Sequence, residues 1–200
     1  LTFCRDWGLL SVHGAEKQLA LAHWSAGNDA SAEHYWELAI GRDETDIESR
    51  LDLAASYLKR GEAGLAEPVL RAMVELQPRS AKDNAMFAHY RGNAWQYLGS
   101  IAAARGDAEG ARAALYAALA EQPESAMLLT NLAVIESRSG DWDASVGLFR
   151  RAAAASPHDP AAWNNLGVAL QSAGEPAEAE SCFKRSWELS QAGVKKATTP

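Results

Sequence analysis

Apolar and small residues recur along the chain with a period of 34 residues, and polar residues separate them. Leu132 has its counterpart at Leu166, 34 positions later. Gly140 has its counterpart at Gly174 in the same way. A fixed period of this length is typical of a stacked array of helices. The pattern therefore predicts two helices in each repeat, with a glycine at the turn between them.

The register of this pattern predicts five repeats. They span residues 13–46, 47–80, 92–125, 126–159 and 160–193. We expect residues 1–12 to cap the first repeat and residues 194–200 to form a flexible tail. Since no full capping helix follows the fifth repeat, its outer face is expected to be open.

The motif W-x2-L-G occurs twice at equivalent positions of the repeat. It is formed by Trp95, Leu98 and Gly99, and by Trp163, Leu166 and Gly167. With the later alanine, phenylalanine or leucine, and proline positions, it resembles the tetratricopeptide repeat, a helix-turn-helix unit. The resemblance covers most of the chain. It implies an all-α fold, a right-handed superhelical solenoid of antiparallel helix pairs.

Each recurring residue type has an expected structural role. Small residues at one position let the two helices of a repeat approach closely: Ala20, Ala54, Gly99, Ala133 and Gly167. Glycines at the inter-helix turn accept a left-handed conformation: Gly27, Gly61, Gly106, Gly140 and Gly174. Prolines stop the second helix: Pro78, Pro123 and Pro157.

Residues 81–91 interrupt the period between the second and third repeats. Eleven residues make about three helical turns, so the insertion preserves the helical phase. It either extends the first helix of repeat three or forms a short separate helix that breaks near Gly92. In the extended form, Met86 and Tyr90 prolong the line of Asn93 and Tyr97 along the helix. They belong to an apolar cluster, the insertion patch, which is either a binding site for a partner or a surface covered by a neighbouring segment, and we favour the partner site.

Composition excludes several classes of function. The formal net charge is −7, which argues against a nucleic-acid partner. No run of about 20 apolar residues occurs, so we expect no membrane-spanning segment and a soluble protein, cytoplasmic or periplasmic. Nucleotide-binding, hydrolase and zinc-protease motifs are absent, and the five histidines show no metal-ligand spacing. We therefore expect no enzymatic activity, no cofactor and no metal.

The resemblance implies that the first helix of each repeat lines a concave groove, which binds an extended peptide or a partner helix. The groove-facing positions select the following residues: Asn93, Gln96, Tyr97, Ser100, Thr130, Asn131, Asn164 and Asn165. The same positions include Met127, Val134, Arg138 and Val168.

Two features of these positions bear on the kind of ligand. Asn131 and Asn165 occupy the same position one repeat apart, and such an amide ladder can pair with a peptide backbone of any sequence. Lys17 matches one position of the family's clamp for a terminal carboxylate, but Leu21 stands where that clamp needs asparagine. A co-chaperone that grips C-terminal peptides is therefore disfavoured.

Together these patterns favour a non-catalytic scaffold or adaptor that binds a protein partner, within a bacterial assembly or secretion complex. Two alternatives remain open. The protein could instead assemble with itself as a homo-oligomer through open repeat ends, or be the targeting domain of a larger enzyme.

Overall fold

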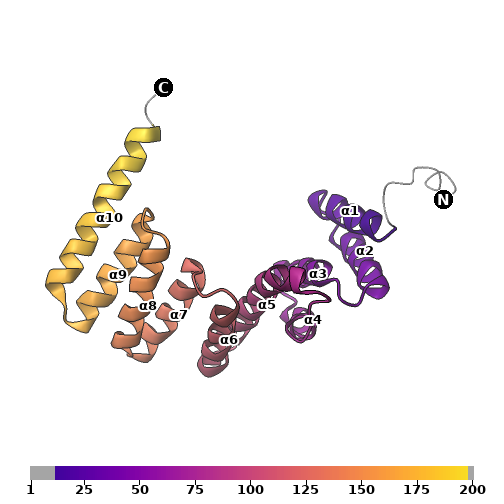
Figure 1. Ribbon diagram of the computed structural model, residues 1–200, viewed down its shortest axis with the longest axis horizontal. Helices are drawn as coiled ribbons and strands as arrows, with labels where there is room; N and C mark the ends of the chain where they lie inside the picture. The colour runs from indigo at the N-terminus through magenta and orange to yellow at the C-terminus, as the bar shows by residue number, and fades with distance from the viewer. Residues whose placement is uncertain (1–11, 198–200) are drawn as a thin grey trace. The chain divides into compact units, whose positions relative to one another are not determined.

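The computed structural model describes residues 12–197 (Figure 1). Over that range the chain forms ten α-helices and one 3-10 helix, without any strand. The all-α fold of paired helices expected from the sequence is confirmed. The predicted N-terminal cap, residues 1–12, lies almost entirely outside the described residues.

The helices form two compact units, which divide between Ala104 and Arg105. The N-terminal unit contains α1 (Val12–Ser25), α2 (Asp29–Arg42), α3 (Ile47–Lys59), α4 (Ala63–Val74), the 3-10 helix η1 (Ala81–Asp83) and α5 (Asn84–Ala104). The C-terminal unit contains α6 (Ala108–Glu121), α7 (Ala126–Ser139), α8 (Trp142–Ala155), α9 (Pro160–Ala173) and α10 (Pro176–Ala197). The division falls at the turn of the predicted third repeat, so its two helices belong to different units.

A left-handed glycine ends the first helix of every pair. The five predicted turn glycines have φ between 77° and 86°. At Gly140 the backbone N–H of the next residue, Asp141, donates to the carbonyl oxygen of Glu136 at 3.0 Å. This bond satisfies a carbonyl that the end of α7 would otherwise leave without a donor. Asp141 then begins α8, since its side chain accepts from the backbone N–H of Ala144.

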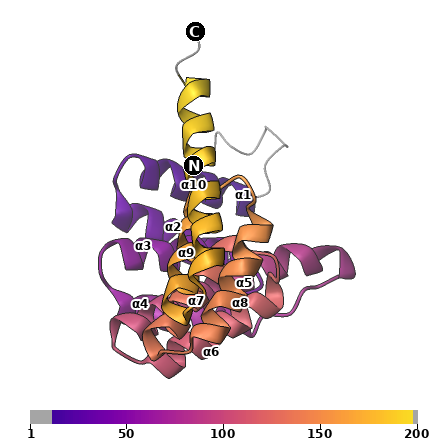
Figure 2. The same ribbon diagram turned by 90° about the vertical axis from the view of Figure 1, so that its left-hand side faces the viewer.

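The small residues allow close packing within the pairs, as the sequence predicted. A Cβ atom on Gly167 of α9 would lie 2.6 Å from the ring of Phe183 on α10. The two helices pack against each other: they lie side by side in Figure 1, and α10 lies in front of α9 in Figure 2. In the N-terminal unit, Trp36 is fully buried and packs edge-on against Trp24 at 5.7 Å between ring centroids. Tryptophans at these positions are therefore packing residues.

The insertion extends a helix and does not form a separate one. Helix α5 is continuous through Gly92, which is buried, so the alternative of a break there is wrong. The 3-10 turn precedes it, and Phe87 joins Ala94, Leu98 and Ile101 on the buried side. These four residues share one face because the eleven-residue insertion keeps the helical phase.

Helix α10 continues to Ala197, four residues beyond the predicted end of the fifth repeat at residue 193. Residues 194–197 are therefore helical, whereas the sequence predicted a loose tail. No helix within residues 12–197 combines the length and the apolar character that a bilayer crossing requires.

The turn conformation can be tested with two glycines of the C-terminal unit. Replacing Gly140 by alanine should lower the free energy of unfolding by ~1 kcal/mol, because a Cβ atom is disfavoured at its φ of 83°. Gly147 lies inside α8, where a Cβ atom would meet no neighbour within 4 Å. Gly147→Ala should therefore stabilise the protein by about 0.5–1 kcal/mol. Equal stability of the two variants in urea unfolding would contradict this assignment.

Candidate functional site

The surface shared by α7 and α9 carries two adjoining cavities, both within the C-terminal unit. The polar cavity has a volume of about 390 Å³, and its lining includes Thr130, Asn131 and Asn165. The apolar cavity has a volume of about 270 Å³, and its lining includes Val134 and Val168. Asn165 lines both cavities, so they form one continuous surface, which we call the α7–α9 face.

The repeat places equivalent residues side by side on this face. Asn131 and Asn165 stand at one position of successive repeats, and both side chains are half-buried. Neither amide makes a hydrogen bond to any other residue in the described range. An amide offers two donors and an acceptor, so both groups are available to a ligand.

The structure separates the predicted site residues into three sets. Thr130, Asn131 and Asn165 come together around the polar cavity. Asn164 is exposed and lines neither cavity, so its prediction as part of the same surface is not supported by its position. It directly precedes Asn165, and consecutive helical residues point about 100° apart.

The remaining predicted residues, Asn93, Gln96, Tyr97 and Ser100, lie on α5 in the N-terminal unit. There the hydroxyl of Ser100 donates to the carbonyl oxygen of Gln96 at 3.1 Å. The side chain of Asn93 lies 3.3 Å from His89 Nε2. The side chains of Asn93 and Ser100 are thus engaged within their own helix, in contrast to the two amides of the α7–α9 face.

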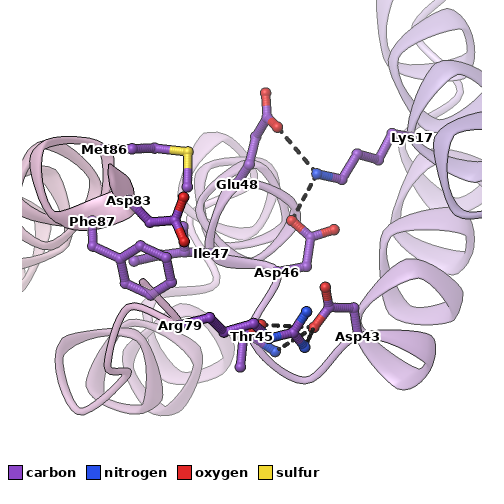
Figure 3. A pocket seen from close by; sticks show the side chains of 10 residues that line it. All are labelled: Lys17, Asp43, Thr45, Asp46, Ile47, Glu48, Arg79, Asp83, Met86 and Phe87. Atoms are coloured by element: carbon purple, nitrogen blue, oxygen red, sulfur yellow. Dashed lines mark hydrogen bonds and ion pairs between the residues drawn. The ribbon is translucent and has the colours of Figure 1, made fainter. Parts of the chain in front are cut away.

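A second cavity region, of about 200 Å³, lies in the N-terminal unit (Figure 3). Charged groups of both signs surround it. Lys17 of α1 contacts Asp46 Oδ1 at 2.8 Å and Glu48 Oε2 at 3.1 Å. Burial opposes the charge of Lys17, but the hydrogen bonds and charges of these two carboxylates raise its pKa overall. Lys17 is therefore engaged within the chain.

The insertion patch has charged surroundings. Met86 lines the N-terminal cavity and is 46% exposed. Tyr90 lies near the carboxylates of Glu48 and Asp52, and burial together with these charges raises the pKa of its hydroxyl. The sequence predicted an apolar cluster here, because it could not show that carboxylates of α3 lie beside α5. Binding of a partner by Met86 and Tyr90 stays a prediction.

The carboxyl group of Asp52, near Tyr90, has a raised pKa. Burial, reinforced by the charges of Glu48 and Asp46 and opposed by that of Lys17, raises its pKa to about 6.

Within residues 12–197, no group of three histidine, cysteine, aspartate or glutamate side chains is arranged to hold a metal ion.

Sequence reasoning missed two aromatic residues of the apolar cavity. Trp142 and Phe149 are not among the site residues that the sequence predicted. Both line the apolar cavity beside Val134 and Val168. They come from α8, whereas the sequence argument considered only the first helix of each repeat. No local signal in the sequence marks this contribution from the second helix.

The raised pKa of Asp52 makes the stability of the protein depend on pH. The folded state binds the proton of Asp52 more tightly than the unfolded chain does, so this contribution is complete below pH 4 and is lost as pH rises through about 6. Asp52→Asn should therefore be more stable than the parent at pH 8, by on the order of 1 kcal/mol after allowance for solvent screening, and equal to it near pH 4. Urea unfolding between pH 4 and pH 8 measures the difference in stability between Asp52→Asn and the parent, with exposed Glu44→Gln as control. A difference in stability that does not change with pH would contradict the prediction.

Comparison with known proteins identifies the repeat. Models described as "Tetratricopeptide repeat" match residues 130–189 and residues 47–72, one segment in each unit. A comparison with curated protein sequences gives no match.

Several solved structures share the fold. A crystal structure of MamA is similar with a TM-score of 0.70 at 19% identity, over 94% of this chain and 97% of that one. A MamA fragment from Desulfovibrio magneticus RS-1 gives 0.67 at 15%, over 90% and 96%. YrrB, described as a TPR protein with an unusual peptide-binding site, gives 0.64 at 12%, over 87% and 84%.

At these identities, the solved structures show the fold. The matched segments, the 34-residue period and the left-handed glycine at each inter-helix turn agree with one another. The chain is a tetratricopeptide repeat protein.

Proposed function

We propose that this protein is a non-catalytic scaffold that binds an extended segment of a partner protein on the α7–α9 face. The observation that carries the proposal is the pair of half-buried amides, Asn131 and Asn165, at equivalent positions beside one cavity. Neither amide has a hydrogen-bond partner among the described residues. A pair of free amides can bind the N–H and C=O groups of a peptide backbone whatever its sequence.

The adjoining apolar cavity supports the same proposal. An extended peptide projects its side chains alternately to opposite sides, so backbone contacts and side-chain pockets act together in peptide recognition. Val134 and Val168 are 37% and 51% exposed, and thus offer apolar surface next to the amides. The peptide-binding site named for YrrB belongs to that protein, and it agrees with the kind of ligand proposed here.

The affinity expected of such a face is modest. Micromolar binding corresponds to about −8 kcal/mol. Two or more backbone hydrogen bonds and one filled apolar pocket can supply this free energy after the cost of ordering the peptide.

A random peptide library displayed on phage, selected against the intact protein, tests the proposal. The double variant Asn131→Ala, Asn165→Ala should bind the selected peptides about tenfold or more weakly in calorimetry, because each lost hydrogen bond contributes about 1 kcal/mol. Asn164→Ala is the matched control, since it removes the same group from the same helix at an exposed site outside both cavities. Unchanged affinity in the double variant, with native helicity, would remove the α7–α9 face from consideration.

A second candidate function, self-association through the end of the array, is favoured by one residue. Helix α10 packs on α9 through buried residues such as Ala179 and Cys182. Trp187 on the same helix is 64% exposed. An exposed aromatic side chain of this size on α10 can pack against a second copy of the chain.

Analytical ultracentrifugation tests this second candidate. If copies associate through α10, Trp187→Ser should shift the protein toward the monomer. Tyr116→Ser is the control, because Tyr116 of α6 is a comparably exposed aromatic residue, at 50%. A parent protein that is monomeric at all micromolar concentrations rules out self-association of this kind.

A further inference from the structure

The apolar cavity carries a single type of charge. Arg138, in the last turn of α7, lines it, and the other lining residues are apolar or uncharged. The side chains of Asp and Glu are absent from this lining. The nearby polar cavity includes Asp159, but that carboxylate already accepts the backbone N–H of Ala161 at 2.9 Å. The lining of the apolar cavity itself is thus positively charged, although the whole chain has a net charge of −7.

Arg138 differs from the other arginines of the described range. Each of the others forms an ion pair, a hydrogen bond to a carbonyl oxygen, or another polar interaction. Arg138 has no such partner within residues 12–197. The C-terminal end of a helix favours a cation, so the position is stable without an acidic side chain beside it. Its guanidinium group is therefore available to a carboxylate.

The hydroxyl groups near Arg138 are already engaged. Ser137 donates to the carbonyl oxygen of Ala133 at 2.9 Å, and Ser172 donates to that of Val168 at 3.0 Å. Both serines line the apolar cavity. The guanidinium of Arg138 is consequently the strongest donor that this cavity presents, and it can bind a carboxylate through two parallel hydrogen bonds.

Apolar surface lies directly beside this cation. Val134 precedes Arg138 by four residues on α7, so the two side chains share one face of the helix. Val168 is its repeat counterpart on α9, and both valines line the cavity. A volume of about 270 Å³ accommodates one large aliphatic side chain.

We infer that the partner segment is an acidic-aliphatic peptide: it places a large aliphatic side chain between Val134 and Val168, and an aspartate or glutamate side chain on Arg138. This inference rests on the proposed binding of a peptide at the α7–α9 face. It adds the class of peptide, since Asn131 and Asn165 bind only the backbone and do not discriminate among sequences. We assign the carboxylate to a side chain and not to a chain end, and the two sources are distinguished by the test below.

The same phage-displayed library tests the inference through the sequences it selects. Peptides selected by the parent protein should be enriched in an acidic residue near a large aliphatic residue. Selection against Arg138→Glu should replace the acidic preference by a basic one and keep the aliphatic residue. Arg185→Glu is the control: it makes the same charge change on α10, outside both cavities, and should leave the profile unchanged.

Affinities of one selected peptide complete the test. Arg138→Glu should weaken its binding by about tenfold or more, since a hydrogen-bonded ion pair is replaced by repulsion. Amidation of the peptide's C-terminus should leave its affinity unchanged; a large loss would assign the carboxylate to the chain end and overturn the inference.

The possible failures are distinguishable. Peptides that require Asn131 and Asn165 but show no acidic preference would overturn the acidic-aliphatic class alone. Selection of no peptide that binds the α7–α9 face would overturn both this inference and the proposed function.

Discussion

The fold depends on a sharp reversal of the chain after the first helix of each pair. This reversal uses a residue with positive φ, which glycine adopts without steric cost, and all five turns use glycine. The reversal brings the apolar faces of two short helices together. Neither helix would be stable alone, because helices of about this length are marginal in water. Small residues then set the separation, as Gly167 does beneath the ring of Phe183. The helix positions that face outward are a consequence of this geometry.

Much of the fold was predictable, because its determinants are local and repeated. The turn glycines, the small residues and the phase of the insertion follow from spacing alone. The division after Ala104 was not predictable, because it depends on how whole helices pack. The engagement of Lys17 was missed for a similar reason, since its partners, Asp46 and Glu48, lie about thirty residues away along the chain. Ion pairs of this kind depend on three-dimensional proximity, and the 34-residue spacing does not reveal them.

The sequence predicted which residues share a surface where the repeat itself carried the information, and binding at that surface stays a prediction. Asn131 and Asn165, like Val134 and Val168, face the same surface because equivalent positions of stacked repeats do so. Asn164 was also predicted to face this surface but lines neither cavity, because one step along a helix turns the side chain by about 100°. The two units also differ in chemistry. The candidate surface of the C-terminal unit leaves the amides of Asn131 and Asn165 unpaired, whereas the side chains of Asn93 and Ser100 in the N-terminal unit are engaged within α5.

The carboxylate of Asp46 holds two parts of the N-terminal unit at once. It caps α3 by accepting from the backbone N–H of Ser49 at 3.2 Å, and it accepts the ammonium group of Lys17 from α1. In repeat arrays, cooperativity comes from the interface between neighbouring repeats, which is usually apolar. Here that interface includes a shared carboxylate, so fraying of the first repeat also weakens the start of the second. The coupling between these two repeats is therefore partly electrostatic, and because the Asp46 side chain is buried, salt screens its ion pair with Lys17 less than it would screen a surface pair.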